Sequence, residues 1–130
     1  MNIAIIAHDN KKELMTSFCI AYKYILQEHT LFATRSTGMA VSKATGLNIH
    51  LLAFGQLGEQ QLAASVACDE IDLLIYFRDP NTHHTDFSTS IFKNCDANNI
   101  PFATNIATAE VLIKGLERKD LAWRELLKQQ

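Results

Sequence analysis

The chain has 130 residues, with 12 lysines and arginines against 14 aspartates and glutamates, so its formal net charge at pH 7 is −2. This length is typical of one domain, and we expect residues 1–130 to form a single domain. The balanced charge argues against nucleic-acid binding, which normally requires an excess of basic residues. Hydrophobic residues make up 48% of the chain and there are only 5 glycines and 2 prolines, a composition typical of globular proteins.

The chain contains no apolar run near the roughly 20 residues that a membrane span requires. Its first apolar run, Ile3–Ala7, ends at His8 and has no basic residues before it, so it does not resemble a signal peptide. Three widely spaced cysteines (Cys19, Cys68 and Cys95) predict buried thiols in a reducing compartment, not disulfides or a zinc site. We therefore expect a cytoplasmic protein that binds no membrane.

In the first half of the chain, apolar runs alternate with segments of helical spacing. The run Ile3–Ala7 predicts a buried strand. Helical structure is then predicted by apolar residues at steps of three and four: Leu14, Phe18, Tyr22, Ile25 and Leu26. A strand at Leu31–Ala33 precedes a helix that we expect to begin within Thr34–Gly38, and a weaker apolar run at Ile49–Phe54 predicts a further strand.

The second half continues the same alternation. In order, we expect a helix around Leu62 and Val66, a strand at Leu73–Phe77, a helix around Ile91 and Cys95, a strand at Phe102–Ala103, a helix carrying Thr108, Val111, Leu112 and Gly115, and a last helix at Leu121–Leu127 with Asp120 as its N-cap.

Nearly continuous apolar strands are typical of parallel sheets that are covered on both faces. Strands that alternate with helices imply right-handed crossovers, so we predict a doubly wound α/β/α fold of the flavodoxin-like kind. In such folds the ligand lies beyond the carboxyl ends of the strands. The polar residues that directly follow each predicted strand are therefore the candidate site.

One candidate is the segment Thr34–Gly38, which places three hydroxyls and several backbone N–H groups at the start of a helix. A helix N-terminus carries partial positive charge and unpaired donors, so it binds phosphate. Lys12, after the first strand, would add an ammonium group. The alternative is that Thr34 and Ser36 are only helix caps.

Glu59 follows the turn after the weaker strand, and we expect it in the first turn of a helix. Most glutamates at such positions are surface groups that compensate the helix dipole. The functional alternative is a general base aimed into the cleft at the strand ends.

Four titratable residues crowd the loop after the strand Leu73–Phe77: Asp79, His83, His84 and Asp86. Imidazole and carboxylate groups in this spacing suit a first-row metal, but a solvated loop is also compatible with them. In the third alternative, a carboxylate orients an imidazole that polarises a substrate carbonyl.

Taken in order, these segments resemble the methylglyoxal synthase family over nearly the whole chain. The resemblance is carried by the segments Ile5–Asp9, Leu31–Thr34, Ser42–Leu47, Arg78–Pro80 and Ile100–Asn105. It implies a five-stranded parallel sheet, assembly as a homohexamer, and conversion of dihydroxyacetone phosphate to methylglyoxal and inorganic phosphate. It implies no metal and no organic cofactor.

The resemblance also implies roles for individual residues. His8 and Lys12 match substrate-contacting residues, and Thr34, Ser36 and Thr37 match the hydroxyls of the phosphate loop. Glu59 falls at the catalytic aspartate, and Asp79 matches a second active-site aspartate. His83 with Asp86 keeps the family's His-x-x-Asp spacing, while His84 is the alternative match. Glu59 would remove a proton from the substrate, and one of the two histidines would stabilise the oxyanion.

This chain departs from the family pattern at several site positions. Arg35 replaces a glycine of the phosphate loop, where its guanidinium would either bind phosphate or obstruct the loop. Phe54 stands in a turn that has lost a phosphate-binding serine, and Leu57 replaces a glycine. Glu59 is one methylene longer than aspartate, and a base misplaced by about 1 Å loses roughly a hundredfold in rate.

These departures leave a second function open. Domains that resemble methylglyoxal synthase also serve as non-catalytic sensors of phosphate or nucleotides, and such domains lack the base. Retention of His8, Asp79, His83 and Asp86 favours the lyase. A phosphoacceptor receiver domain of similar architecture is set aside, because Thr104 and Asn105 follow the final strand where that family has a lysine.

Overall fold

The computed structural model describes residues 1–82 and 86–128. Its strands are β1 (Asn2–Ala7), β2 (Thr30–Ala33), β3 (Ile49–Leu51), β4 (Leu73–Phe77) and β5 (Phe102–Ala103). Its helices are α1 (Lys12–Ala21), α2 (Lys23–Leu26), α3 (Arg35–Thr45), α4 (Gly55–Ala67), α5 (Asp86–Ala97), α6 (Ile106–Glu117) and α7 (Ala122–Lys128), with a short 3₁₀ turn at Asp9–Lys11.

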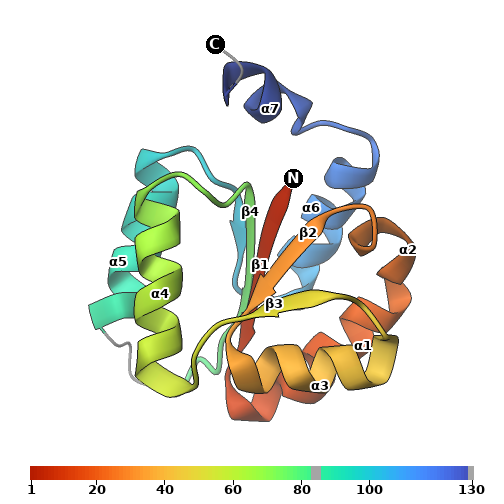
Figure 1. The fold of residues 1–130 in the computed structure, drawn as a ribbon, viewed down its shortest axis with the longest axis vertical. Helices are drawn as coiled ribbons and strands as arrows, with labels where there is room; N and C mark the ends of the chain where they lie inside the picture. The colour runs from red at the N-terminus through yellow and green to blue at the C-terminus, as the bar shows by residue number, and fades with distance from the viewer. Residues whose placement is uncertain (83–85, 129–130) are drawn as a thin grey trace.

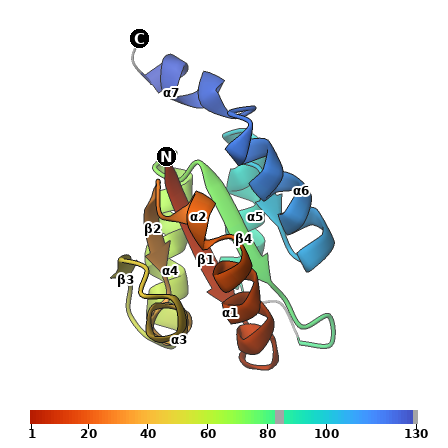
Figure 2. The ribbon, with the colours of Figure 1, turned by 90° about the vertical axis from the view of Figure 1, so that its right-hand side faces the viewer.

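The strands form one five-stranded sheet in the order β3-β2-β1-β4-β5. All four pairings are parallel, and β1 lies at the centre with Ile5 beside both Ala33 of β2 and Ile75 of β4. Helices α4 and α5 lie together on one face, and α1, α3 and α6 lie on the other (Figures 1 and 2). This arrangement confirms the predicted doubly wound α/β fold.

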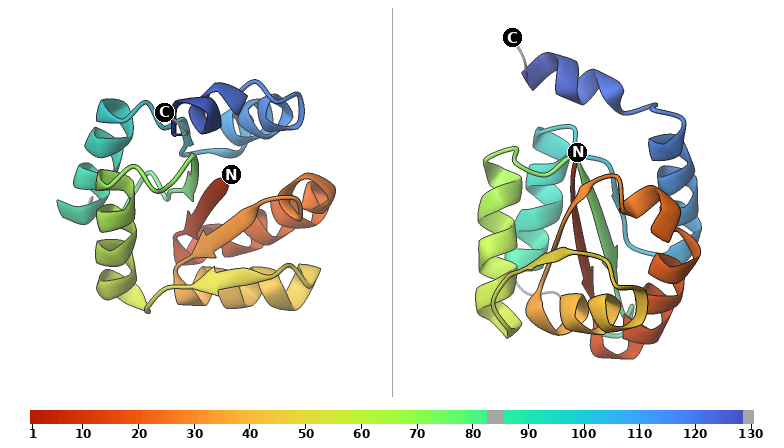
Figure 3. Two further views of the ribbon diagram at one scale, coloured as in Figure 1. Left: turned by 45° about the horizontal axis from the view of Figure 1, so that its top comes forward. Right: turned by 45° about the vertical axis from the view of Figure 1, so that its right-hand side comes forward.

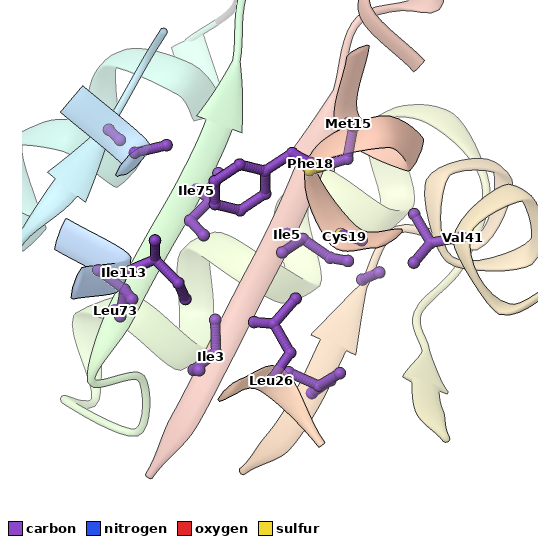
Figure 4. Close-up of a cluster of buried hydrophobic side chains, with 14 of the residues drawn as sticks. Ile3, Ile5, Met15, Phe18, Cys19, Leu26, Val41, Leu73, Ile75 and Ile113 are labelled. Carbon is purple, nitrogen blue, oxygen red and sulfur yellow. The ribbon is translucent and has the colours of Figure 1, made fainter. Parts of the chain in front are cut away.

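Alternation along β1 divides the core between the two faces. Ile3 and Ile5 point toward α1, α3 and α6, where they pack with residues such as Met15, Phe18, Val41 and Ile113 (Figure 4). Ala4 and Ile6 point to the other face and pack against Leu62 and Val66 of α4 and Ile91 and Cys95 of α5. Both faces of the central strands are therefore buried, which explains their continuous apolarity.

The predicted elements are present, with small differences at their ends. The strand expected at Ile49–Phe54 ends at Leu51, because the chain then turns and the Ala53 carbonyl accepts a hydrogen bond from the Arg35 amide. The helical segment after β1 is divided at Tyr22 into α1 and α2. The prediction of three buried cysteines was wrong for Cys68, which is exposed because it follows the last residue of α4, while Cys19 and Cys95 are buried.

Helix α7 lies at the amino end of the sheet, near the N-terminus (Figure 3). Arg124 is only 3% exposed and fastens this helix: its guanidinium binds Asp69 and Asp72 and the carbonyl oxygens of Asn98 and Asn99. The helix begins at Ala122, and the carboxylate expected to cap it, Asp120, is instead bound by Arg118. No helix within the described ranges has the length and apolarity needed to cross a membrane.

Candidate active site

A cavity of about 520 Å³ opens at the carboxyl end of the sheet. Residues at the ends of β1, β2 and β4 and at the start of α4 line it, because parallel strands bring their carboxyl ends to one edge. The lining consists of Ile6, Ala7, His8, Asp9, Asn10, Lys12, Thr34, Ser36, Gly55, Gln56, Glu59, Tyr76, Asp79 and Thr82. Six of the residues predicted from the sequence are thus brought together: His8, Lys12, Thr34, Ser36, Glu59 and Asp79.

His8 is held between two strand ends. Its Nδ1 accepts a hydrogen bond of 2.8 Å from the backbone amide of Asp79, and its Nε2 lies 3.4 Å from the hydroxyl of Tyr76. Because a backbone N–H can only donate, Nδ1 is the acceptor, and the neutral ring carries its proton on Nε2. Burial is the main cause that lowers the pKa of His8, so the neutral form is favoured. The ring is therefore a neutral hydrogen-bond donor.

Glu59 projects from α4 into the cavity and is half-buried. Its Oε1 accepts a hydrogen bond of 2.6 Å from the Tyr76 hydroxyl, and the Ser88 hydroxyl lies 3.4 Å from the same oxygen. The first turn of α4 contains no acidic residue, since the helix begins at Gly55 and Glu59 stands beyond that turn. The expectation of a first-turn position was therefore wrong, and compensation of the dipole at the helix end does not account for this carboxylate.

Two glycines shape the entry into α4. Gly55 has a φ of +58°, a left-handed conformation that favours glycine. A Cβ atom on Gly58 would collide with the backbone carbonyl oxygen of Ala53. The chain can therefore turn from β3 into α4 closely enough to present Glu59 to the cavity.

The hydroxyls at the start of α3 divide into two groups. Thr37 is buried, and its Oγ1 accepts a hydrogen bond of 3.2 Å from the amide of Ala7, so it ties α3 to the end of β1. Thr34 lies 3.4 Å from that hydroxyl and also lines the cavity. Ser36 is exposed and lines the cavity. Thr34 precedes α3, but its side chain forms no capping hydrogen bond. The hydroxyl of Thr34 therefore does not act as a simple helix cap.

Lys12 and Asp79 supply charges of opposite sign at the cavity wall. The Lys12 ammonium lies 2.6 Å from Asp9 Oδ1 and 3.3 Å from the Ala7 carbonyl. The Asp79 carboxylate accepts hydrogen bonds from the Asn81 amide and the Thr82 hydroxyl, which lower its pKa. Asp79 is therefore ionised. Its backbone amide bonds His8, and its carboxylate bonds the residues that follow it, Asn81 and Thr82.

Two of the predicted residues, Arg35 and Phe54, lie outside the cavity lining. The Arg35 guanidinium stacks over the ring of Phe54 at 5.6 Å, and neither residue lines the cavity. Phe54 is 60% exposed and does not fill the site. His83 and His84 lie outside the described residues, and Asp86 is described only as the first residue of α5.

Sequence reasoning missed Tyr76 and Ser88. Tyr76 belongs to the apolar run of β4, where its aromatic ring indicates core packing and gives no sign that its hydroxyl reaches the site. Ser88 lies in the first turn of α5 and is not part of the His-x-x-Asp spacing that precedes it. Within the described ranges, no three His, Cys, Asp or Glu side chains gather as they would to hold a metal ion.

Comparison with known proteins agrees with this parallel α/β fold. Residues 16–104 match the family model of the MGS-like domain. The chain is 53% identical to methylglyoxal synthase of Caldicellulosiruptor saccharolyticus, over 98% of this chain and 92% of that protein. It is 52% identical to the methylglyoxal synthase of Oceanobacillus iheyensis, over 99% and 94% of the two chains.

The fold of this chain also matches that of a solved structure. The crystal structure of methylglyoxal synthase from Elizabethkingia anophelis NUHP1 matches with a TM-score of 0.78 at 30% identity, covering 86% of this chain and 76% of that chain. The chain belongs to the methylglyoxal synthase family.

Proposed function

We propose that this protein is a methylglyoxal synthase, a lyase that converts dihydroxyacetone phosphate to methylglyoxal and inorganic phosphate, with Glu59 as its general base. The observation that carries the proposal is the position of Glu59: its carboxylate lies in the cavity and accepts a 2.6 Å hydrogen bond from a buried tyrosine. A sensor of phosphate would have no use for a carboxylate held in this way. Family membership supports the same activity.

The phosphoryl group of the substrate would bind between α3 and Lys12. Ser36 lines the cavity at the start of α3, where backbone N–H groups and the helix dipole favour an anion. The Lys12 ammonium, already close to the end of β1, would exchange its contact with exposed Asp9 for the phosphate. Thr34 and Thr37 would support this loop by their bonds to each other and to β1.

The reaction would begin when Glu59 takes a proton from the hydroxymethyl carbon, next to the carbonyl. The electron pair left behind forms an enediolate, whose oxyanion needs a hydrogen-bond donor. His83 or His84 is proposed for this task by resemblance, oriented by Asp79 or Asp86. His8 contributes a neutral imidazole in contact with the cavity. Triosephosphate isomerase pairs a glutamate base with a neutral histidine on a related substrate, so the combination is chemically sound.

The enediolate would then expel phosphate. An electron pair of the enediolate oxygen on the former hydroxymethyl carbon forms the aldehyde C=O bond, the C=C pair shifts toward the phosphate-bearing carbon, and the C–O bond there breaks with its pair leaving on phosphate. The remaining enol of methylglyoxal then loses its hydroxyl proton and takes up a proton on its terminal carbon. Lys12 and the α3 N-terminus would stabilise the charge of the departing dianion. Arg35 and Phe54 would form the outer rim, since they contact each other outside the cavity lining.

We also propose that the protein is cytoplasmic and, by resemblance, that it works as a homohexamer. Light scattering coupled to size-exclusion chromatography tests the assembly: a mass near six times 14.6 kDa is expected, and a monomeric mass would contradict it.

The direct test of the function is to incubate the purified protein with dihydroxyacetone phosphate and to measure methylglyoxal and phosphate independently. We expect the two products to appear in equal amounts. Absence of both products, together with measurable binding of inorganic phosphate, would contradict the lyase and favour the sensor.

A further inference from the structure

The geometry points to Tyr76 as a positioning residue for Glu59: its buried hydroxyl, assisted by Ser88, holds the carboxylate of the longer glutamate side chain where the base must act. This inference rests on the proposed function, in which Glu59 removes the proton from the substrate. It concerns how this chain works with a glutamate at a position where the family has an aspartate.

Tyr76 is a rigid support. Its side chain is 0% exposed and lies on the face of the sheet that α4 and α5 cover. Its ring centroid lies 5.5 Å from that of Phe92 in α5 and 5.5 Å from that of His8, with which it forms a T-shaped contact. Since these contacts fix the ring, the hydroxyl occupies one place at the floor of the cavity.

The bond from this hydroxyl to Glu59 is short and has a defined direction. At 2.6 Å, the distance from the Tyr76 oxygen to Glu59 Oε1 is that of a hydroxyl bonded to a carboxylate. Burial is the main cause that raises the pKa of Tyr76, so the phenol keeps its proton and donates a hydrogen bond to Glu59. The Ser88 hydroxyl lies 3.2 Å from the Tyr76 oxygen and 3.4 Å from Oε1, and so supports the pair from α5.

The same hydroxyl links Glu59 to residues that follow β1 and β4. The Asp79 amide donates to His8 Nδ1, and His8 Nε2 lies 3.4 Å from the phenol oxygen that bonds Glu59. A hydrogen-bonded chain therefore runs from the end of β4 through His8 and Tyr76 to α4. The orientation of the Glu59 carboxylate is tied to the strand ends.

This arrangement explains how a glutamate serves at position 59. Its side chain has one more rotatable bond than aspartate, so an unrestrained carboxylate would spend less time in the reactive position. An aspartate here would withdraw the carboxylate by one C–C bond length and lose the short bond to the Tyr76 hydroxyl. Glu59 and Tyr76 therefore act as a unit, and their substitutions should not be additive.

The test measures kcat and KM with dihydroxyacetone phosphate for Tyr76→Phe, Glu59→Asp and the double variant. We expect Tyr76→Phe to lower kcat about tenfold to a hundredfold, the effect of losing one hydrogen bond to a charged group, with KM within about twofold. In the Glu59→Asp background, the same substitution should change kcat less than about twofold. A general loss of structure would lower kcat in both backgrounds. A loss of kcat that depends on Glu59 and leaves KM unchanged therefore indicates positioning of the carboxylate.

Tyr22→Phe is the matched control. The Tyr22 hydroxyl also bonds a carboxylate, that of Glu110 at 2.9 Å, but neither residue lines the cavity. We expect this variant to keep the wild-type kcat and KM. Circular dichroism and thermal unfolding establish that each variant is folded. If Tyr76→Phe does not fold, Ser88→Ala replaces it, with a smaller loss of kcat expected and the same dependence on Glu59.

Two results would overturn the inference. One is an active wild type in which Tyr76→Phe, or its replacement Ser88→Ala, leaves kcat unchanged. The other is an equal loss of kcat in the wild-type and Glu59→Asp backgrounds, which would show that the tyrosine does not act through the carboxylate. A wild-type protein without turnover would instead overturn the proposed function, and this inference with it.

Discussion

The backbone amide of Asp79 donates a 2.8 Å hydrogen bond to Nδ1 of His8, which joins the ends of two adjacent strands across the candidate site. This bond requires a neutral ring with its proton on Nε2, because a proton on Nδ1 would face the amide hydrogen. The site is therefore built around an uncharged imidazole.

Because burial of the ring lowers the pKa of His8, we predict that His8 titrates below the usual value of about 6.5. As pH falls below 6.5, the unfolded chain takes up the proton before the folded chain does. His8 thus contributes stability that is fully present above pH 6.5 and is lost as the pH falls from 6.5 toward the lower pKa of the folded state. Activity should decline over the same range.

The measurement is an NMR titration of the histidine Cε1–H resonances, with the His8 signal assigned by its absence from a His8→Gln variant. A midpoint below the usual 6.5 is expected for His8. A midpoint at or above that value would contradict the neutral ring.

Gly58→Ala tests the close approach between α4 and the preceding turn. The new Cβ would collide with the Ala53 carbonyl oxygen. Because this oxygen belongs to the backbone and cannot turn aside as a flexible side chain can, the first turn of α4 must shift and carry Glu59 with it. We expect a loss of kcat of about a hundredfold. Gly115→Ala is the control, since its Cβ would meet only Asp120, with Oδ2 nearest at 3.5 Å, an ordinary contact. Equal activity of the two variants would refute this account of the turn.

Lys12 and Arg35 offer a comparison of two cations near the phosphate loop. Lys12 lines the cavity, whereas Arg35 is engaged with the Phe54 ring outside it. We predict that Lys12→Met raises KM for dihydroxyacetone phosphate at least about tenfold, and that Arg35→Met changes KM less than about threefold. The measurement is a comparison of the KM values of the two variants with that of the wild type by steady-state kinetics. A larger effect at Arg35 would mean that the guanidinium reaches the substrate.

Arg124→Ala tests how α7 is fastened to the amino end of the sheet. This guanidinium is 3% exposed and pairs with Asp72, whose carboxylate is 5% exposed. Burial opposes ionisation of Asp72, but bonds from Lys128, the Asn2 amide and Arg124 outweigh it and lower the pKa. Removing Arg124 should cost about 3 kcal/mol in the free energy of unfolding, measured with denaturant.

The control for this variant is Arg118→Ala. Arg118 forms a 3.0 Å ion pair with Asp120, but both side chains are more than half exposed. Its loss should cost less than about 1 kcal/mol. Similar costs for the two variants would contradict the buried role of Arg124. The cavity lies at the other end of the sheet, so kcat of folded Arg124→Ala should equal that of the wild type.

Much of the fold was predictable from the sequence, because the strands are short and nearly all apolar. Ile3–Ala7 and Leu73–Phe77 were predicted within one residue of β1 and β4, since no polar residue interrupts either run. The end of β3 was not predicted correctly, because the apolar run continues through residues 52–54, past the last strand residue. There the backbone turns in order to bond α3.

Part of the cavity lining was predictable where polar residues closely follow strands, as for His8, Thr34 and Asp79. The contact of Tyr76 with Glu59 was not predictable. A tyrosine within an apolar strand gives the same sequence pattern whether or not its hydroxyl bonds a carboxylate. Arg35 shows the opposite difficulty. Its charge suggests phosphate binding, but the nearby exposed ring of Phe54 offers it a cation–π contact that sequence spacing does not reveal.

The role of Glu59 as the base is tested by comparing wild type with Glu59→Gln, using both turnover and equilibrium binding of dihydroxyacetone phosphate. Glutamine has the same length and can still accept the Tyr76 hydrogen bond, but it cannot take the proton. We predict that kcat falls by about 10²- to 10⁴-fold while the dissociation constant changes less than about threefold. Turnover by Glu59→Gln at the wild-type rate would show that another group is the base.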